Sequence, residues 1–137
     1  MTITPSQKYW IETEELIRGQ RRAVEAEVDG LCEFLKDVHQ GDLVRLRFEE
    51  GATRKAWFLG YHRNIMDTVV LSVLGSQGHS ENMVLGCLSP EVWVLAKSIL
   101  TPEDAPIGHL RFLEVDSIQG GPPRFFFFTQ EDKGKIK

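Results

Sequence analysis

Apolar residues recur at every seventh position along the first 40 residues, and no other feature of this sequence constrains the fold as strongly. A repeat of seven keeps these side chains on one face of an α-helix. The residues with this spacing are Trp10, Ile17, Val24, Leu31 and Val38. The spacing predicts a helical arm over residues 1–40, ahead of everything else in the chain.

A second apolar row accompanies the first only in the later part of this arm. Val28 and Leu35 occupy that row, whereas Glu14 and Arg21 stand at the equivalent earlier positions. The arm therefore has a coiled-coil-like seam only from residue 24 onward. The seam consists of Val24, Val28, Leu31 and Leu35. It is a candidate partner-binding surface, although packing against the chain's own second domain explains the pattern equally well.

The arm has a clear beginning but an ambiguous middle. Thr4, Pro5 and Gln7 form a capping box with proline at the first helical position. Gly19 weakens a helix by about 1 kcal/mol relative to alanine. The arm is thus one long helix or a short hairpin, about 5–18 and 20–38. In a hairpin, Glu14 and Glu15 would lie near the tip, where we name them as candidate partner-binding residues.

From Asp42 the period of the apolar residues changes from 3.5 to two, which is typical of strands with one buried face. The alternation and the turn residues predict five or six short strands, with an uncertain segment at 83–88 and a loop at 75–82. We expect strands near 43–48, 54–61, 68–74, 92–99, 109–118 and 124–129. The fold class is α+β: a helical arm, then a small antiparallel barrel or bent sheet over residues 41–130, then a frayed polar tail at 131–137.

A run of four phenylalanines, residues 125–128, places large rings on both faces of the last strand. Such a strand is buried on both sides, or it presents one face to a partner. Phe126 and Phe128 are the candidate partner-binding residues on this strand. The sequence leaves open which face is buried.

Charge and composition favour a binding protein over an enzyme or a nucleic-acid protein. The formal net charge is −4, and residues 1–40 alone carry five basic and eight acidic side chains. This balance makes nucleic acid a less favoured partner and favours a basic protein surface. We find no catalytic, metal or cofactor motif. The first ten residues lack a signal-peptide pattern and no apolar run is long enough to span a membrane, so we expect a cytoplasmic protein.

The order of segments resembles the C-terminal domain of Gre-type transcription elongation factors and their short relatives that regulate nucleoside diphosphate kinase. The similar segments are GDLVRLRF at 41–48, WFLGYH at 57–62, LSVLGSQGHSENMVLG at 71–86, EVWVLA at 91–96 and HLRFLEVDSI at 109–118. The resemblance implies docking on RNA polymerase. The arm is about half as long as the family's hairpin and lacks its acidic tip element, so the resemblance implies no stimulation of transcript cleavage.

A second resemblance is to the Sm-like fold, in which a helix precedes a five-stranded barrel. Phe58 to Tyr61, then Asn64 to Asp67, are similar to the family's first motif, and Met83 to Gly86 to its second. The arginine of the second motif is absent, and His62 stands where an acid is expected. This resemblance implies an RNA-binding or assembly module, and a structural subunit of a multiprotein complex is a further alternative.

Overall fold

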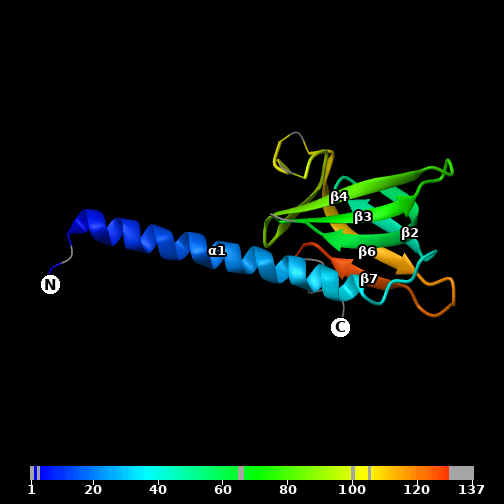
Figure 1. The fold of residues 1–137 in the computed structure, drawn as a ribbon, viewed down its shortest axis with the longest axis horizontal. Helices are drawn as coiled ribbons and strands as arrows, with labels where there is room; N and C mark the ends of the chain where they lie inside the picture. Colours follow the sequence, from blue (N-terminus) through cyan, green and yellow to red (C-terminus); the bar gives the residue numbers. More distant parts are fainter. Residues whose placement is uncertain (1, 3, 65–66, 100, 105, 130–137) are drawn as a thin grey trace.

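The computed structural model describes residues 2, 4–64, 67–99, 101–104 and 106–129. A single long helix is followed by an antiparallel sheet, and the first half of the helix projects from the β domain (Figure 1). The predicted α+β class with a helical arm is confirmed. The predicted polar tail at 131–137 lies outside the described residues.

Helix α1 spans Pro5–Leu35 without a break. The predicted capping box is present: the Thr4 hydroxyl accepts from the Gln7 backbone N–H at 3.3 Å, and the Gln7 side chain accepts from the Thr4 N–H at 3.0 Å. These bonds satisfy helix N–H groups that have no partner in the first turn. Gly19 lies inside the continuous helix, so the hairpin alternative is wrong.

Seven strands follow the helix in the described part of the chain, one more than the upper end of our prediction. Each strand pairs antiparallel with the next along the chain. The strands are β1 (Leu43–Phe48), β2 (Thr53–Arg63), β3 (Thr68–Leu74), β4 (Ser80–Ser89), β5 (Val92–Ala96), β6 (Gly108–Asp116) and β7 (Arg124–Phe127). The uncertain segment 83–88 and the end of the expected loop at 75–82 both belong to β4, which forms a hairpin with β3.

The sheet closes on itself because β1 also pairs with β6, from Leu43 opposite Asp116 to Phe48 opposite Leu110. The edge of β6 that does not pair with β1 is shared by β5 and β7. Its beginning pairs with β5 at Val94 and Leu95, and its end pairs with β7. β5 and β7 therefore diverge from one another, and rings of Trp93 and Phe128 fill the space between them, with centroids 5.3 Å apart.

The second half of α1 covers this region of the barrel. The Phe126 ring from β7 lies 5.8 Å from the Phe34 ring of α1, and a Cβ placed on Gly30 would be 3.8 Å from Phe126. An ion pair between Asp29 and Arg63 joins the helix to β2. The helix and the inner faces of the strands consequently form one hydrophobic core.

The connection between β5 and β6 packs against the outer side of the sheet at β4. Pro102 is buried there, and an added Cβ at Gly86 would lie only 2.8 Å from the Pro102 Cβ. A side chain at residue 86 would push the loop away, so this close approach requires glycine. Val70 and Val94, on the strands beside β4, are also buried.

Candidate functional site

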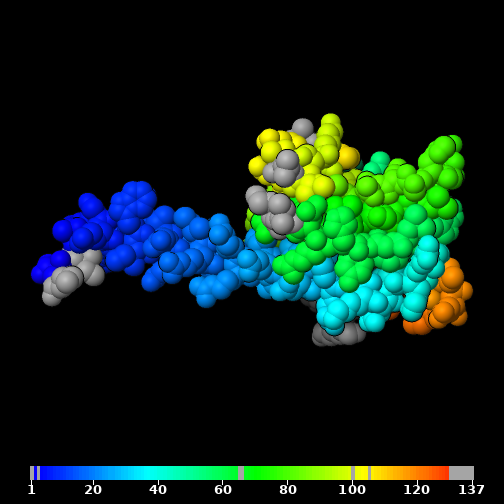
Figure 2. Space-filling model, viewed as in Figure 1, coloured from blue at the N-terminus to red at the C-terminus, as the bar shows by residue number. Residues whose placement is uncertain are grey.

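The first half of α1 carries large apolar side chains that are mostly exposed. Trp10 is 68% exposed, Leu16 is 64% exposed and Ile17 is 53% exposed. No residue between Pro5 and Ala23 is buried. In the space-filling view this segment extends away from the β domain into solvent (Figure 2). An exposed apolar surface of this extent is typical of an interaction site.

These side chains share one face of the helix. Tyr9 and Leu16 are seven residues apart, as are Trp10 and Ile17, so the pairs lie two turns apart on the same side. We call the group Tyr9, Trp10, Thr13, Leu16 and Ile17 the arm stripe. Ile11, which is 45% exposed, lies on a different side of the helix.

The arm stripe continues the seam that begins at residue 24, but the seam itself is not available to a partner. Val24, Val28, Leu31 and Leu35 are buried in the chain's own core. Their assignment as partner-binding residues is therefore corrected: the β domain supplies the apolar surface that covers them. The candidate binding surface lies about two to four turns nearer the N-terminus than Val24. Two of its side chains, Trp10 and Ile17, belong to the row that the repeat of seven already placed on this face.

Glu14 and Glu15 are exposed on the free half of α1, as expected for a partner-binding role, which stays a prediction. Because the arm is one helix, these two carboxylates do not form the tip of a hairpin. Glu14 lies 3.7 Å from Arg18 in an ion pair within the helix. Exposed pairs of this kind contribute only a few tenths of a kcal/mol, so a partner's charges can replace them at little cost.

The phenylalanine run is divided between the core and the surface, and the division is the reverse of our assignment. Phe128 is fully buried and Phe126 is half-buried against Trp93 and Phe34. Both face the interior, so neither presents a free partner-binding surface. Phe125 and Phe127 point outward instead, because successive side chains of a strand alternate between its faces.

The outward rings belong to a larger aromatic surface across β2, β1, β6 and β7. The register places Phe112 of β6 opposite Phe127, and Leu43 of β1 opposite Trp57. Phe112, Phe125 and Phe127 form a contiguous cluster with ring centroids 5.6 to 5.9 Å apart. We call Trp57, Phe112, Phe125 and Phe127 the outer aromatic face. Trp57 is 38% exposed and Phe125 is 37% exposed.

Charged side chains lie between these rings. Arg45 forms ion pairs with Glu114, at 3.2 Å, and with Asp116. The hydrogen bond to Asp116 raises the pKa of Arg45. Arg47 places its guanidinium 5.9 Å from the Phe112 centroid, and Lys55 is exposed opposite Arg45 on β2. The Arg47 guanidinium donates to the Gly51 carbonyl at 2.7 Å. Among the residues that the structure describes, neither Arg47 nor Lys55 has a carboxylate partner.

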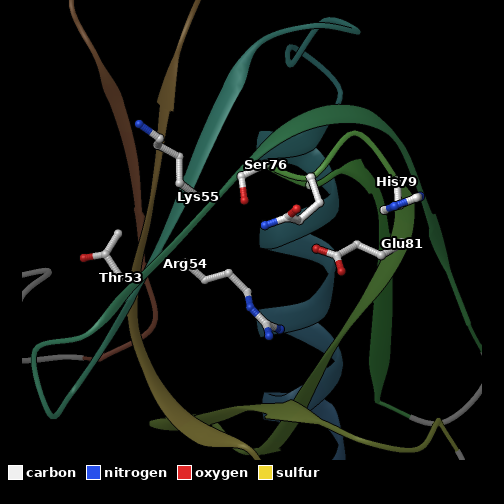
Figure 3. Close-up of a pocket in the computed structure, with 8 residues that line it drawn as sticks. Thr53, Arg54, Lys55, Ser76, His79 and Glu81 are labelled. Carbon is white, nitrogen blue, oxygen red and sulfur yellow. The ribbon is translucent and has the colours of Figure 1, made fainter.

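An open hollow of about 580 Å³ lies between the start of β2 and the β3–β4 hairpin. In Figure 3, Arg54 and Glu81 extend into it from opposite sides, with Ser76 between them, while Lys55 and Thr53 point away. The lining side chains are exposed, so water hydrates these charges of both signs. The hollow has no buried polar group that would orient a bound molecule.

Reactive and metal-binding groups are sparse in the described part of the chain. No cluster of three or more His, Cys, Asp or Glu side chains there is arranged to hold a metal ion. Cys32 and Cys87 form no disulfide bond. Burial raises the pKa of the Cys32 thiol, with an opposing contribution from Arg63. A thiol with a raised pKa is mostly protonated at neutral pH and is a poor nucleophile.

Comparison with known proteins finds no matching family model, no matching curated protein and no matching solved structure. Within the described residues, no helix is both long enough and apolar enough to cross a membrane. The function must therefore be inferred from the surfaces of this chain alone.

Proposed function

We propose that this protein is a non-catalytic regulator that docks on a larger protein assembly through the free half of α1. One observation carries the proposal: the arm stripe presents Trp10, Leu16 and Ile17 to solvent, on a stretch of helix in which no residue from Pro5 to Ala23 is buried. Buried aromatic and aliphatic side chains of this kind supply most of the binding energy at protein interfaces.

The isolated state of the arm also supports a docking role. Helices of about 12–15 residues are marginal in water, and most helical stability in proteins comes from packing of an apolar face. The free part of α1 exceeds that length only slightly and contains Gly19. A partner that covers the arm stripe would supply the missing packing energy, and binding would be coupled to stabilisation of the helix.

RNA polymerase is the partner that we propose to test first, because residues 41–118 resemble the Gre-type domain. The protein would bind without stimulating transcript cleavage, since a single helix has no paired acidic tip. The localisation that accompanies this proposal is cytoplasmic.

The test is a binding titration of the full-length protein against purified RNA polymerase core enzyme, with Ile17→Glu and Ile11→Glu compared in parallel. Both variants add the same charge to the same exposed helix, but only residue 17 belongs to the arm stripe. We expect saturable binding that Ile17→Glu weakens at least about tenfold, a loss of roughly 1.4 kcal/mol. Absence of binding by the unmodified protein would exclude polymerase, and equal effects of the two variants would exclude the arm stripe as the docking surface.

The outer aromatic face favours a second candidate, binding of single-stranded RNA. Stacking of bases on Phe125 and Trp57, with phosphates near Lys55 and Arg47, would follow a common mode of recognition. Glu114 and Asp116 on the same face oppose phosphate binding, so we rank this function second. Fluorescence anisotropy with a labelled oligouridine at low salt tests it, and an unchanged signal at saturating protein would exclude it.

A further inference from the structure

The described residues form two exposed apolar surfaces that differ in shape. The arm stripe is a convex apolar ridge on a helix, and the outer aromatic face is a broad sheet surface with exposed rings. Four neighbouring strands span about 14 Å at a spacing of about 4.8 Å. A helix with its side chains is about 10–12 Å wide. The outer aromatic face is therefore wide enough to seat one helix.

Carboxylates beside the arm stripe can meet cations on the outer aromatic face. Glu12 and Glu14 lie on opposite sides of the arm stripe, at about 100° from its centre line, because each residue advances about 100° around a helix. Each of these carboxylates forms an exposed ion pair with a basic side chain of α1, at 3.9 and 3.7 Å, which contributes little and can be exchanged for a partner's cation. The outer aromatic face carries Arg47 and Lys55, which have no carboxylate partner among the described residues. A helix seated on the face would bring two carboxylates at its rim toward two cations.

An arm cannot reach the outer aromatic face of its own chain. α1 is continuous from Pro5 to Leu35, and its second half is held in the core by the seam and by the ion pair between Asp29 and Arg63. This anchoring directs the free half away from the β domain (Figures 1 and 2). The arm stripe is thus available to a second molecule and not to its own sheet.

We infer that the arm stripe of one copy docks on the outer aromatic face of a second copy, so that this protein assembles head to tail. The contact is heterologous: it uses two different surfaces, so a pair of bound copies still has one free arm and one free face. The inference rests on the proposed role of the free half of α1 as an interaction surface, and it names the partner that this surface meets when no other protein is present. Assembly then proceeds beyond a dimer, to a ring or to an open chain.

Sedimentation velocity over a wide concentration range tests this assembly with the full-length protein alone. We expect the unmodified protein to form species larger than a dimer as its concentration rises. Ile17→Glu disables the arm and Phe125→Glu disables the face, and each variant alone should remain monomeric. An equimolar mixture of the two should form a dimer and nothing larger, because only one intact arm and one intact face meet.

Matched controls separate the contact from general effects of the added charge. Ile11→Glu places the same charge on the arm outside the stripe, and Leu88→Glu places it at a side chain of β4 that is 38% exposed, close to the exposure of Phe125. Both controls should assemble like the unmodified protein. Lys55→Glu should also weaken assembly, and it provides a face variant that alters no packed ring. Circular dichroism melting of each variant shows whether the β domain remains folded.

Three results would overturn the inference. The first is an unmodified protein that sediments as a monomer throughout its soluble range. The second is a mixture of Ile17→Glu and Phe125→Glu that forms no dimer. The third is full assembly by both single face variants, Phe125→Glu and Lys55→Glu. The last result would mean that arms pair with arms or with another surface. A monomeric protein that still binds RNA polymerase would overturn head-to-tail assembly and leave the proposed function intact.

Discussion

The Asp42 carboxylate accepts a hydrogen bond from the Ile118 backbone N–H at 3.1 Å, across 76 positions of sequence. Its second oxygen accepts from the His39 N–H at 2.9 Å. Asp42 is 1% exposed, and it stands where the chain leaves α1 and enters β1. A single side chain therefore connects the end of the arm to the turn between β6 and β7.

Replacing Asp42 by alanine should lower the free energy of unfolding by about 1–3 kcal/mol, because two backbone N–H groups lose a charged acceptor. Asp42→Asn retains one acceptor oxygen and should lose less. Urea denaturation followed by fluorescence measures both variants. Equal stabilities for the alanine variant and the unmodified protein would show that water replaces the carboxylate.

Truncation of an apolar side chain should lower the stability far more in the second half of α1 than in the first. Leu31→Ala removes a side chain that is 0% exposed and should cost about 2–5 kcal/mol. Ile17→Ala changes a side chain that is 53% exposed and should alter stability by less than about 0.5 kcal/mol. Thermal melts at several protein concentrations distinguish packing within one molecule from packing between molecules. Packing within one molecule predicts the same loss of stability for Leu31→Ala at each concentration.

The last strand allows a comparison between adjacent phenylalanines. Phe128→Ala should cost about 3–5 kcal/mol because the ring is fully buried beside Trp93. Phe125→Ala should cost under about 1 kcal/mol, since its ring is 37% exposed. Chemical denaturation of the two variants under identical conditions provides the measurement. A larger loss for Phe125→Ala would mean that the strand presents the opposite face to the core.

Gly86→Ala should destabilise the protein by about 1–3 kcal/mol, because its new Cβ would lie 2.8 Å from the Pro102 Cβ and displace the packed loop. Gly60→Ala is the matched control within a strand, since an added Cβ at that position meets nothing within 4 Å. The melting temperature of Gly86→Ala should be clearly lower than that of Gly60→Ala. A comparable small shift for both would show that the loop moves at no cost.

Gly19→Ala should stabilise the free part of the arm by about 1 kcal/mol through helix propensity alone. No neighbouring atom lies within 4 Å of the added Cβ, so the substitution creates no clash. Hydrogen exchange of amides in residues 5–23 should slow, while the unfolding midpoint of the β domain stays unchanged. Unaltered exchange would indicate that the arm does not open as an independent helix.

Local patterns were sufficient for much of the fold. The capping box at Thr4 and the repeat of seven predicted the beginning and the face of α1, because both depend on residues only a few positions apart. The change to period two at Asp42 predicted β1 for the same reason, and the boundaries of β3 were correct. Short-range periodicity reports which side chains share a face of an element.

The tertiary structure decided what each face meets. The seam of α1 could have faced a partner, and only its burial in one core with residues of the strands shows that it packs on its own β domain. Phe126 and Phe128 face inward because Trp93 and Phe34 supply their neighbours, whereas an isolated strand with rings on both sides has no preferred face. Pairing of β1 with β6 and the carboxylate of Asp42 at Ile118 likewise join distant segments. Such contacts depend on the relative placement of whole elements, which no local spacing encodes, and this placement leaves Trp10, Ile17 and Phe125 exposed on the surface.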